Sequence, residues 1–190
     1  MKEKVLFEKY KKGKHWEAHP IDYAERFADF LLKNNFQGLL ADIGCASGKH
    51  TAVFRAKGIN VVGIDISEDE IETAKVEHPD CRFAKQDAES LEFTDESVAA
   101  FFMINVIHYL DKEKAFKEVY RTLKKGGYLF IHFNLLITDR EGNIDYSQTE
   151  SDVMRLVSDF RMVGKKIFER VDAAPKEHTH KILELILQKE

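Results

Sequence analysis

The chain has 190 residues, of which 44% are hydrophobic and 33% are charged, a length and composition typical of one globular domain. It carries 29 Lys and Arg residues against 33 Asp and Glu residues, which gives a formal net charge of −4. Proteins that bind phosphate backbones usually carry an excess of positive charge. The charge balance therefore disfavours a nucleic acid as the partner.

The cysteines and the first residues of the chain bear on its location. Cys45 and Cys81 are too few for a disulfide framework or a cysteine-based zinc site, which favours a reducing compartment. Residues 1–14 lack the apolar segment of a signal peptide, and the longest apolar run, 98–104, is far shorter than the ~18 residues of a membrane helix. We expect a cytoplasmic protein with no membrane segment and no metal site.

Helices and strands are predicted to alternate along the first 133 residues. Apolar side chains at helical spacing indicate helices, and short continuous apolar runs indicate buried strands. The expected elements, in chain order, are helix 22–33, strand 39–43, helix 51–57, strand 61–64, helix 68–77, strand 81–84, strand 98–104, helix 112–124 and strand 128–133. This alternation predicts an α/β fold, a doubly wound parallel sheet with helices on both faces.

The pattern changes after residue 133. Residues 134–148 are largely polar and are expected to form a long loop, and long loops in compact domains are often functional. A helix is predicted near 149–159. Two strands near 162–171 and 179–188 are expected to form a terminal hairpin, which makes one edge of the sheet antiparallel.

Acidic residues stand at the ends of three expected strands: Asp42, Asp65 and Asp87. Ligands of open α/β sheets bind at these carboxyl ends, and Asp65 can accept hydrogen bonds from both hydroxyls of a ribose. Gly44 and Gly48 have no side chain to keep a ligand away from the backbone of the first turn. Any one of the acids could instead cap a helix, but their joint placement favours a nucleoside site.

The spacing of the glycines separates two classes of nucleoside. Dinucleotide-binding proteins use Gly-x-Gly-x-x-Gly and rest a pyrophosphate on a helix N-terminus, whereas this turn has Gly44-x-x-x-Gly48. Asp42, which precedes the first glycine, would repel such an anion. An acid beside a glycine turn suits a ligand with an ammonium or sulfonium charge, which is the character of S-adenosylmethionine.

Residues 40–48, Leu-Ala-Asp-Ile-Gly-Cys-Ala-Ser-Gly, resemble motif I of the class I S-adenosylmethionine-dependent methyltransferases. Residues 62–67 resemble the strand with the family's ribose-binding acid, and residues 83–88 resemble the segment whose acid meets the adenine amino group. The resemblance implies a Rossmann-like, seven-stranded, mostly parallel sheet with a C-terminal antiparallel strand. It also implies S-adenosylmethionine as cofactor and S-adenosylhomocysteine as product. Ala46 stands where the family usually has a glycine, so this turn must tolerate a Cβ atom.

The resemblance also assigns residues to the site. Asp42 is expected to hold the methionine end of the cofactor, directly or through water. The residues expected to contact the cofactor are Asp42, Gly44, Ala46, Gly48, Asp65, Ile66, Asp87, Ala88 and Asn105.

Three residues are candidates for catalysis: His108, Tyr109 and His19. His108 and Tyr109 follow the fourth strand, where many small-molecule methyltransferases of the family have histidines. Helix capping or core packing accounts for His108 nearly as well. His19 belongs to an aromatic and imidazole cluster that could close over the cofactor, or could equally pack on the surface.

We expect one methyltransferase domain over residues 1–190. Its parts are an N-terminal arm and possible lid at 1–20, a cofactor-binding core at 21–133, a substrate-side loop at 134–148 and a C-terminal helix and hairpin at 149–190.

The acceptor is predicted to be a small molecule. The fourth strand ends in Met-Ile-Asn-Val at 103–106 and lacks the Asp/Asn-Pro-Pro-Tyr/Phe signature of enzymes that methylate amino groups of nucleic-acid bases. The sequence also lacks an inserted substrate domain. Two alternatives stay open: a nicotinamide-dependent oxidoreductase, which shares the sheet and the ribose acid, and a non-catalytic methyltransferase-like subunit.

Overall fold

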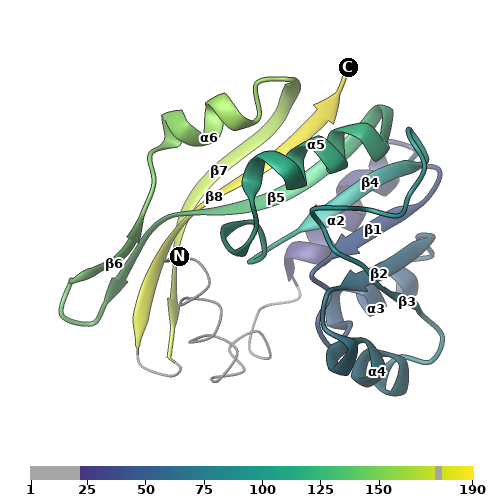
Figure 1. Ribbon diagram of the computed structural model, residues 1–190, viewed down its shortest axis with the longest axis horizontal. Helices are drawn as coiled ribbons and strands as arrows, with labels where there is room; N and C mark the ends of the chain where they lie inside the picture. The colour runs from purple at the N-terminus through teal and green to yellow at the C-terminus, as the bar shows by residue number, and fades with distance from the viewer. Residues whose placement is uncertain (1–21, 174–176) are drawn as a thin grey trace.

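The computed structural model of the chain describes residues 22–173 and 177–190. The helices of the described residues are α2 (Asp22–Lys33), α3 (Lys49–Ala56), α4 (Glu68–Glu77), the 3₁₀ helix η2 (Ile107–Tyr109), α5 (Lys112–Thr122) and α6 (Glu150–Leu156). The strands are β1 (Leu40–Ile43), β2 (Val61–Asp65), β3 (Arg82–Lys85), β4 (Val98–Met103), β5 (Leu123–Asp139), β6 (Ile144–Ser147), β7 (Phe160–Asp172) and β8 (His178–Lys189) (Figure 1). The predicted lid at 1–20, with its candidate His19, lies outside the described residues.

The strands form one mixed sheet in the order β3-β2-β1-β4-β5-β8-β7, and β6 pairs with β5 off this path. The first five strands of that path are parallel, while β8 runs antiparallel to both β5 and β7. The predicted fold class is confirmed, with seven strands along the path and an antiparallel strand from the C-terminal end. The parallel order brings the carboxyl ends of β1, β2 and β4 to the same edge of the sheet.

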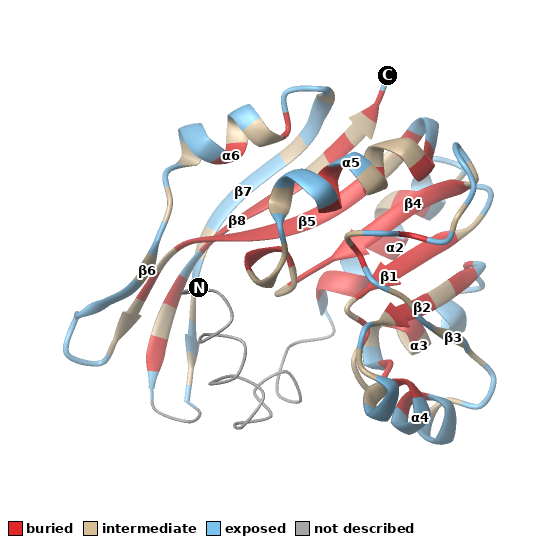
Figure 2. Ribbon diagram, viewed as in Figure 1, coloured by how far each residue is buried: buried red, intermediate tan, exposed pale blue. Residues whose placement is uncertain are grey.

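Helices cover both faces of the sheet (Figure 1), and the buried residues follow the strands between them (Figure 2). On one face α2 and α3 pack through aromatic rings, and the centroid of Phe102 lies 5.0 Å from that of Phe54 and 5.1 Å from that of Phe130. On the other face α5 and α6 contribute Phe116 and Val153 to a second core cluster. β1 and β4 are buried at every position, because both of their faces are covered. This is why they read as continuous apolar runs.

A partly buried ionic contact joins α2 to β8. The carboxylate of Glu184 accepts hydrogen bonds from Nη1 and Nη2 of Arg26 at 2.8 and 2.7 Å, and it lies 3.0 Å from Nε2 of His132. Burial raises the pKa of Glu184, but the hydrogen bonds from Arg26 and His132 outweigh that effect and lower the pKa to about 2. Glu184 is therefore ionised at neutral pH and helps to hold α2 on the sheet.

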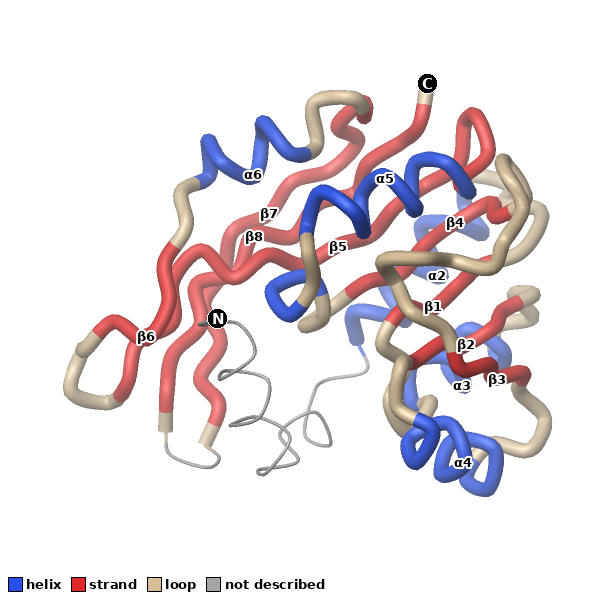
Figure 3. Tube along the Cα trace, viewed as in Figure 1, coloured by secondary structure: helices blue, strands red, loops and turns tan. Residues whose placement is uncertain are grey.

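The prediction of a loop over 134–148 is wrong. β5 continues to Asp139 and β6 pairs antiparallel with it, so much of the segment forms a hairpin (Figure 3). Leu135 and Ile137 are buried, and β8 pairs with β5 as far as His178 opposite Asp139. The neighbouring strands satisfy backbone groups that a loop would leave to water, and this pairing outweighs the polar composition.

None of the helices within 22–173 and 177–190 has the length and apolarity needed to cross a bilayer. The helices of this part of the chain are short and have charged outer faces, as α4 shows with Glu68, Asp69 and Glu70 in its first turn. Ser67 caps that helix, and its Oγ accepts a hydrogen bond from the N–H of Glu70 at 3.4 Å, as the Ser-x-x-Glu pattern predicts.

We expect Glu184→Gln to lower the free energy of unfolding by about 1–2 kcal/mol at neutral pH. The loss is smaller than the pKa shift alone implies, because the Arg26 side chain is 41% exposed and water screens its charge. The folded pKa lies below the ordinary value of 4.5, so the stabilisation is complete above that pH and declines as the pH falls towards 2. Urea unfolding of both chains across this range measures the difference. A difference that stays constant with pH would contradict the assignment.

Candidate cofactor site

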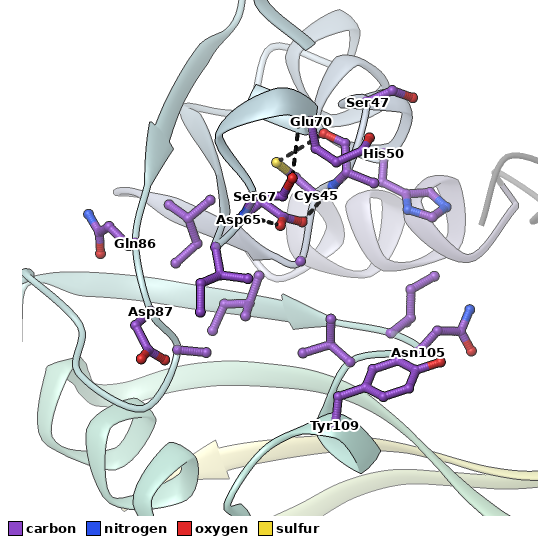
Figure 4. A pocket seen from close by; sticks show the side chains of 18 of the residues that line it. Cys45, Ser47, His50, Asp65, Ser67, Glu70, Gln86, Asp87, Asn105 and Tyr109 are labelled. Atoms are coloured by element: carbon purple, nitrogen blue, oxygen red, sulfur yellow. Dashed lines mark hydrogen bonds between the residues drawn. The ribbon is translucent and has the colours of Figure 1, made fainter. Parts of the chain in front are cut away.

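A cavity of about 470 Å³ opens at the carboxyl ends of β1, β2 and β4, within the range of small-ligand sites. Figure 4 shows Asp65 on one side of this space, with Asp87 and Tyr109 approaching it from different elements. The cavity is lined by Ile43, Gly44, Cys45, Ala46, Ser47, Lys49, His50, Ile64, Asp65, Ile66, Ser67, Glu68, Asp69, Glu70, Gln86, Asp87, Ala88, Ile104, Asn105, Val106, Tyr109 and Leu110.

The turn after β1 requires its first glycine. Gly44 has φ +71°, in the left-handed region, and a Cβ atom there would lie 1.9 Å from Cγ2 of Val106. Gly48, at φ +85°, is similarly enclosed, since a Cβ atom would lie 2.6 Å from the ring of Phe83. Gly44 lines the cavity, whereas Gly48 does not. The missing side chain of Gly48 instead allows Phe83 of β3 to pack against the start of α3.

Ala46 adopts the conformation that its place in the motif demands, with φ +45°, although it carries a Cβ atom. A non-glycine residue in this region is strained, and such strain is often found at ligand sites. Here the backbone N–H of Ala46 donates a hydrogen bond to Oδ2 of Asp65 at 3.0 Å, which holds the turn in place.

The carboxylate of Asp65 joins the turns that follow β1 and β2. Oδ2 accepts from Ala46, and Oδ1 accepts from the N–H of Ser67 at 2.9 Å. Each carboxylate oxygen can accept about two hydrogen bonds, so Asp65 keeps acceptor capacity toward the cavity that it lines. This is the capacity that a pair of ribose hydroxyls would use.

Asp42 lies behind the turn and is not part of the cavity wall. Its side chain is buried, and Oδ2 accepts a hydrogen bond from Oγ1 of Thr51 at 2.6 Å. Burial raises the pKa of Asp42, while the nearby His50 and the hydrogen bond from Thr51 oppose this change. In this arrangement Asp42 orients the start of α3, and any effect on a ligand acts through that helix or through water.

The other predicted cofactor residues all line the cavity: Ile66, Asp87, Ala88 and Asn105. Oδ1 of Asp87 accepts a hydrogen bond from the N–H of Glu89 at 2.8 Å, which fixes the carboxylate at the start of the loop that follows β3. Asn105 has φ +57°, a second strained position at the edge of the same cavity.

The two described catalytic candidates differ in position. Tyr109 lines the cavity, whereas His108 is 5% exposed and does not. The rings of His108 and Tyr109 lie 4.1 Å apart, and Nδ2 of Asn134 lies 3.4 Å from Nδ1 of His108. His108 therefore contacts the cavity only through its neighbour.

Several lining residues were not predicted, above all Lys49, His50, Glu70 and Gln86. Lys49 and His50 begin α3, and Glu70 lies in the first turn of α4. Only the positions of these residues in the sequence could have indicated that they line the cavity. Helices that follow glycine turns or strand ends direct their first turns at the ligand. Their residue types alone do not distinguish them from ordinary surface side chains.

The cavity is rich in acids, and its one thiol is inert. The acidic lining residues are Asp65, Glu68, Asp69, Glu70 and Asp87, against Lys49 and His50 as basic groups. Burial raises the pKa of the Cys45 thiol, and the nearby Asp42 and Asp65 carboxylates raise it further. A thiol that stays protonated is a poor nucleophile. The charge pattern favours a cationic ligand over a pyrophosphate.

Comparisons with known proteins agree with this geometry. Residues 41–131 match the family described as methyltransferase domain. A probable tRNA methyltransferase 9B of Homo sapiens is 33% identical over 111 residues, which are 56% of this chain and 24% of that protein. The chloroplastic 2-methyl-6-phytyl-1,4-hydroquinone methyltransferase of Spinacia oleracea is 31% identical over 118 residues, which are 60% of this chain and 33% of that protein. The match thus spans only a quarter to a third of these relatives.

Solved structures share the fold. An S-adenosylmethionine-dependent methyltransferase of Methanosarcina mazei aligns with a TM-score of 0.69 at 23% identity, over 84% of this chain and 96% of that one. The family match agrees with the resemblance seen in residues 40–48, 62–67 and 83–88, and the solved structure shares the fold. Residues 41–131 of the chain are thus similar to the methyltransferase domain family.

Proposed function

We propose that the chain transfers a methyl group from S-adenosylmethionine to a nucleophilic atom of a small-molecule acceptor. The observation that carries the proposal is the meeting of the glycine turn, Asp65 and Asp87 around one acid-rich cavity. In this arrangement Asp65 binds the ribose, Asp87 meets the adenine amino group, and Gly44 lets the methionine part lie against the backbone.

The transfer itself depends on position more than on a dedicated acid or base. Displacement at a sulfonium carbon needs the nucleophile in line with the departing sulfur. Holding the two reactants in this geometry can lower the activation barrier by ~7–11 kcal/mol. Tyr109 lines the cavity and is the polar side chain we assign to the acceptor side. His108 is a positioning residue that acts through Tyr109, and His19 stays a prediction.

A small molecule suits the acceptor side better than RNA. The net charge is −4, and the cavity is lined by five carboxylic acids against Lys49 and His50. A polynucleotide would meet repulsion at the mouth of this cavity. The relative of Homo sapiens carries tRNA in its name, so tRNA belongs in the test as a competing acceptor.

A binding experiment tests the cofactor assignment. We expect Asp65→Asn to weaken S-adenosylhomocysteine binding about 10- to 100-fold, because each hydrogen bond to a charged group contributes about 1.5–3 kcal/mol. Titration calorimetry with S-adenosylhomocysteine, S-adenosylmethionine and NADH measures this on the wild type and the variant. Asp80→Asn, an exposed acid outside the cavity, serves as the matched control and should bind normally. Unchanged affinity in a folded Asp65→Asn chain would sink the ribose assignment, and binding of NADH alone would favour the oxidoreductase.

A kinetic experiment tests the acceptor side. Purified chain with methyl-labelled S-adenosylmethionine is offered small thiols, amines and phenols, and separately bulk tRNA. Label in a small molecule supports the proposal, label in tRNA replaces it, and cofactor binding without any transfer favours a non-catalytic subunit.

With an acceptor in hand, we expect Tyr109→Phe and His108→Ala each to lower kcat at least tenfold. The affinity for S-adenosylhomocysteine should change less than about threefold, since neither change removes a cofactor contact. The double variant should be no slower than the worse single one, because His108 acts through Tyr109. Tyr146→Phe, on β6, is the matched control. Additive losses in the double variant would show that His108 acts independently.

A further inference from the structure

A second group of titratable side chains gathers where β7 and β8 approach their connection, outside the cofactor cavity. The ligand atoms of Asp172, His178 and His180 all lie within 4.8 Å of one another. The two strands pair Asp172 with His178, and His180 lies two residues along β8, on the same face. Because His178 also lies opposite Asp139 at the end of β5, the group stands at the edge of the sheet where the parallel strands end (Figure 1).

The distances within this group suit a small metal ion. Oδ2 of Asp172 lies 3.3 Å from Nε2 of His180 and 4.0 Å from Nε2 of His178. Two ligand atoms bound to a tetrahedral zinc ion at about 2.1 Å are separated by about 3.4 Å. The pair Asp172 and His180 already has this spacing, and Nε2 of His178 lies somewhat farther from Asp172, at 4.0 Å.

Asn134 on β5 orients the imidazole of His180. Nδ1 of His180 lies 3.1 Å from Oδ1 of Asn134, and a carbonyl oxygen can only accept, so Nδ1 carries the proton. Nε2 then keeps its lone pair toward Asp172. Within the described part of the chain, this buried Nε2 makes no hydrogen bond. A lone pair facing a carboxylate at 3.3 Å is unfavourable unless a proton or a metal cation lies between them.

A neighbouring arginine fixes the carboxylate of Asp172. Nε and Nη2 of Arg170 donate to Oδ1 and Oδ2 of Asp172, both at 2.8 Å. Hydrogen-bonded partners of this kind commonly orient metal-ligating carboxylates and histidines. The positive charge of Arg170 weakens the attraction of Asp172 for a cation.

We propose that Asp172, His178 and His180 bind a divalent transition-metal ion of the zinc type. Two imidazoles and one carboxylate prefer Zn²⁺, Co²⁺ or Ni²⁺ to Mg²⁺, and three protein ligands leave a fourth position for water or for a donor atom of another molecule. Asn134 connects this site to His108, and thereby to the wall of the cofactor cavity. The metal site is independent of the proposed methyl transfer, because none of its ligands lines that cavity.

Metal titration of the full chain, freed of metal by a chelator and without cofactor, tests the site. We expect one Zn²⁺ per chain, a visible absorption band with Co²⁺ and no competition by Mg²⁺. The double variant His178→Asn/His180→Asn should bind Zn²⁺ at least tenfold more weakly and lose the Co²⁺ band. His78→Gln is the matched control, since His78 also has a buried Nε2 but is not part of this group.

Equal Zn²⁺ affinity in the wild type and the double variant would overturn the proposal, as would an equal loss in His78→Gln. If the double variant does not fold, modification of the wild type with diethyl pyrocarbonate, mapped by mass spectrometry, replaces it. Zn²⁺ should then protect the peptide with His178 and His180 and leave the reactivity of His78 unchanged. Protection of neither peptide, or of both alike, would contradict the site.

Discussion

The parallel pairing of β1 with β2 is the constraint on which the cofactor site depends. Its register places Ile43 opposite Ile64, and the carbonyl of Ile64 accepts hydrogen bonds from the N–H groups of Gly44 and Cys45 at 2.8 and 3.0 Å. The turn after β1 is thereby held against the end of β2. Asp65, the last residue of β2, can then reach the N–H of the strained turn. Without this register the glycines and the acid would be separate features with no common ligand.

The same sheet carries a second polar system on its C-terminal half. β5 is long enough to extend past the ends of its parallel neighbours, and β8 follows it to the end. Their shared face holds Glu184 against Arg26, and nearer the end it holds Asn134 between His108 and His180. The extension of β5 thus links packing, the proposed metal site and the wall of the cofactor cavity in one element.

The sequence signals for the candidate cofactor site are local. The apolar runs, the glycines and the acids at strand ends stand within a few residues of each other, and the structure brings Asp65 and Asp87 to one cavity as expected. Asp42 differs, since the same signal cannot tell an acid that faces a ligand from one that points behind the turn. The direction of the Asp42 side chain is set by the packing of α3 over β1, where Thr51 donates a hydrogen bond to the carboxylate.

The C-terminal half of the sheet was harder to predict because its residues are brought together over long separations. Residues 134–148 look like a loop by composition, and they become strand only because β8 and β6 supply partners for their backbone groups. By itself the sequence determined the fold class, the glycine turn and the acids that follow the strands, since these rest on local periodicity and spacing. The family entered only as a resemblance of short motifs. Tertiary structure alone decided three features. These are the length of β5, the positions of Asp42 and His108 outside the cavity wall, and the proximity of Asp172 to His178 and His180. Each of these depends on pairing and packing between segments far apart in the chain, which no local pattern of residues encodes.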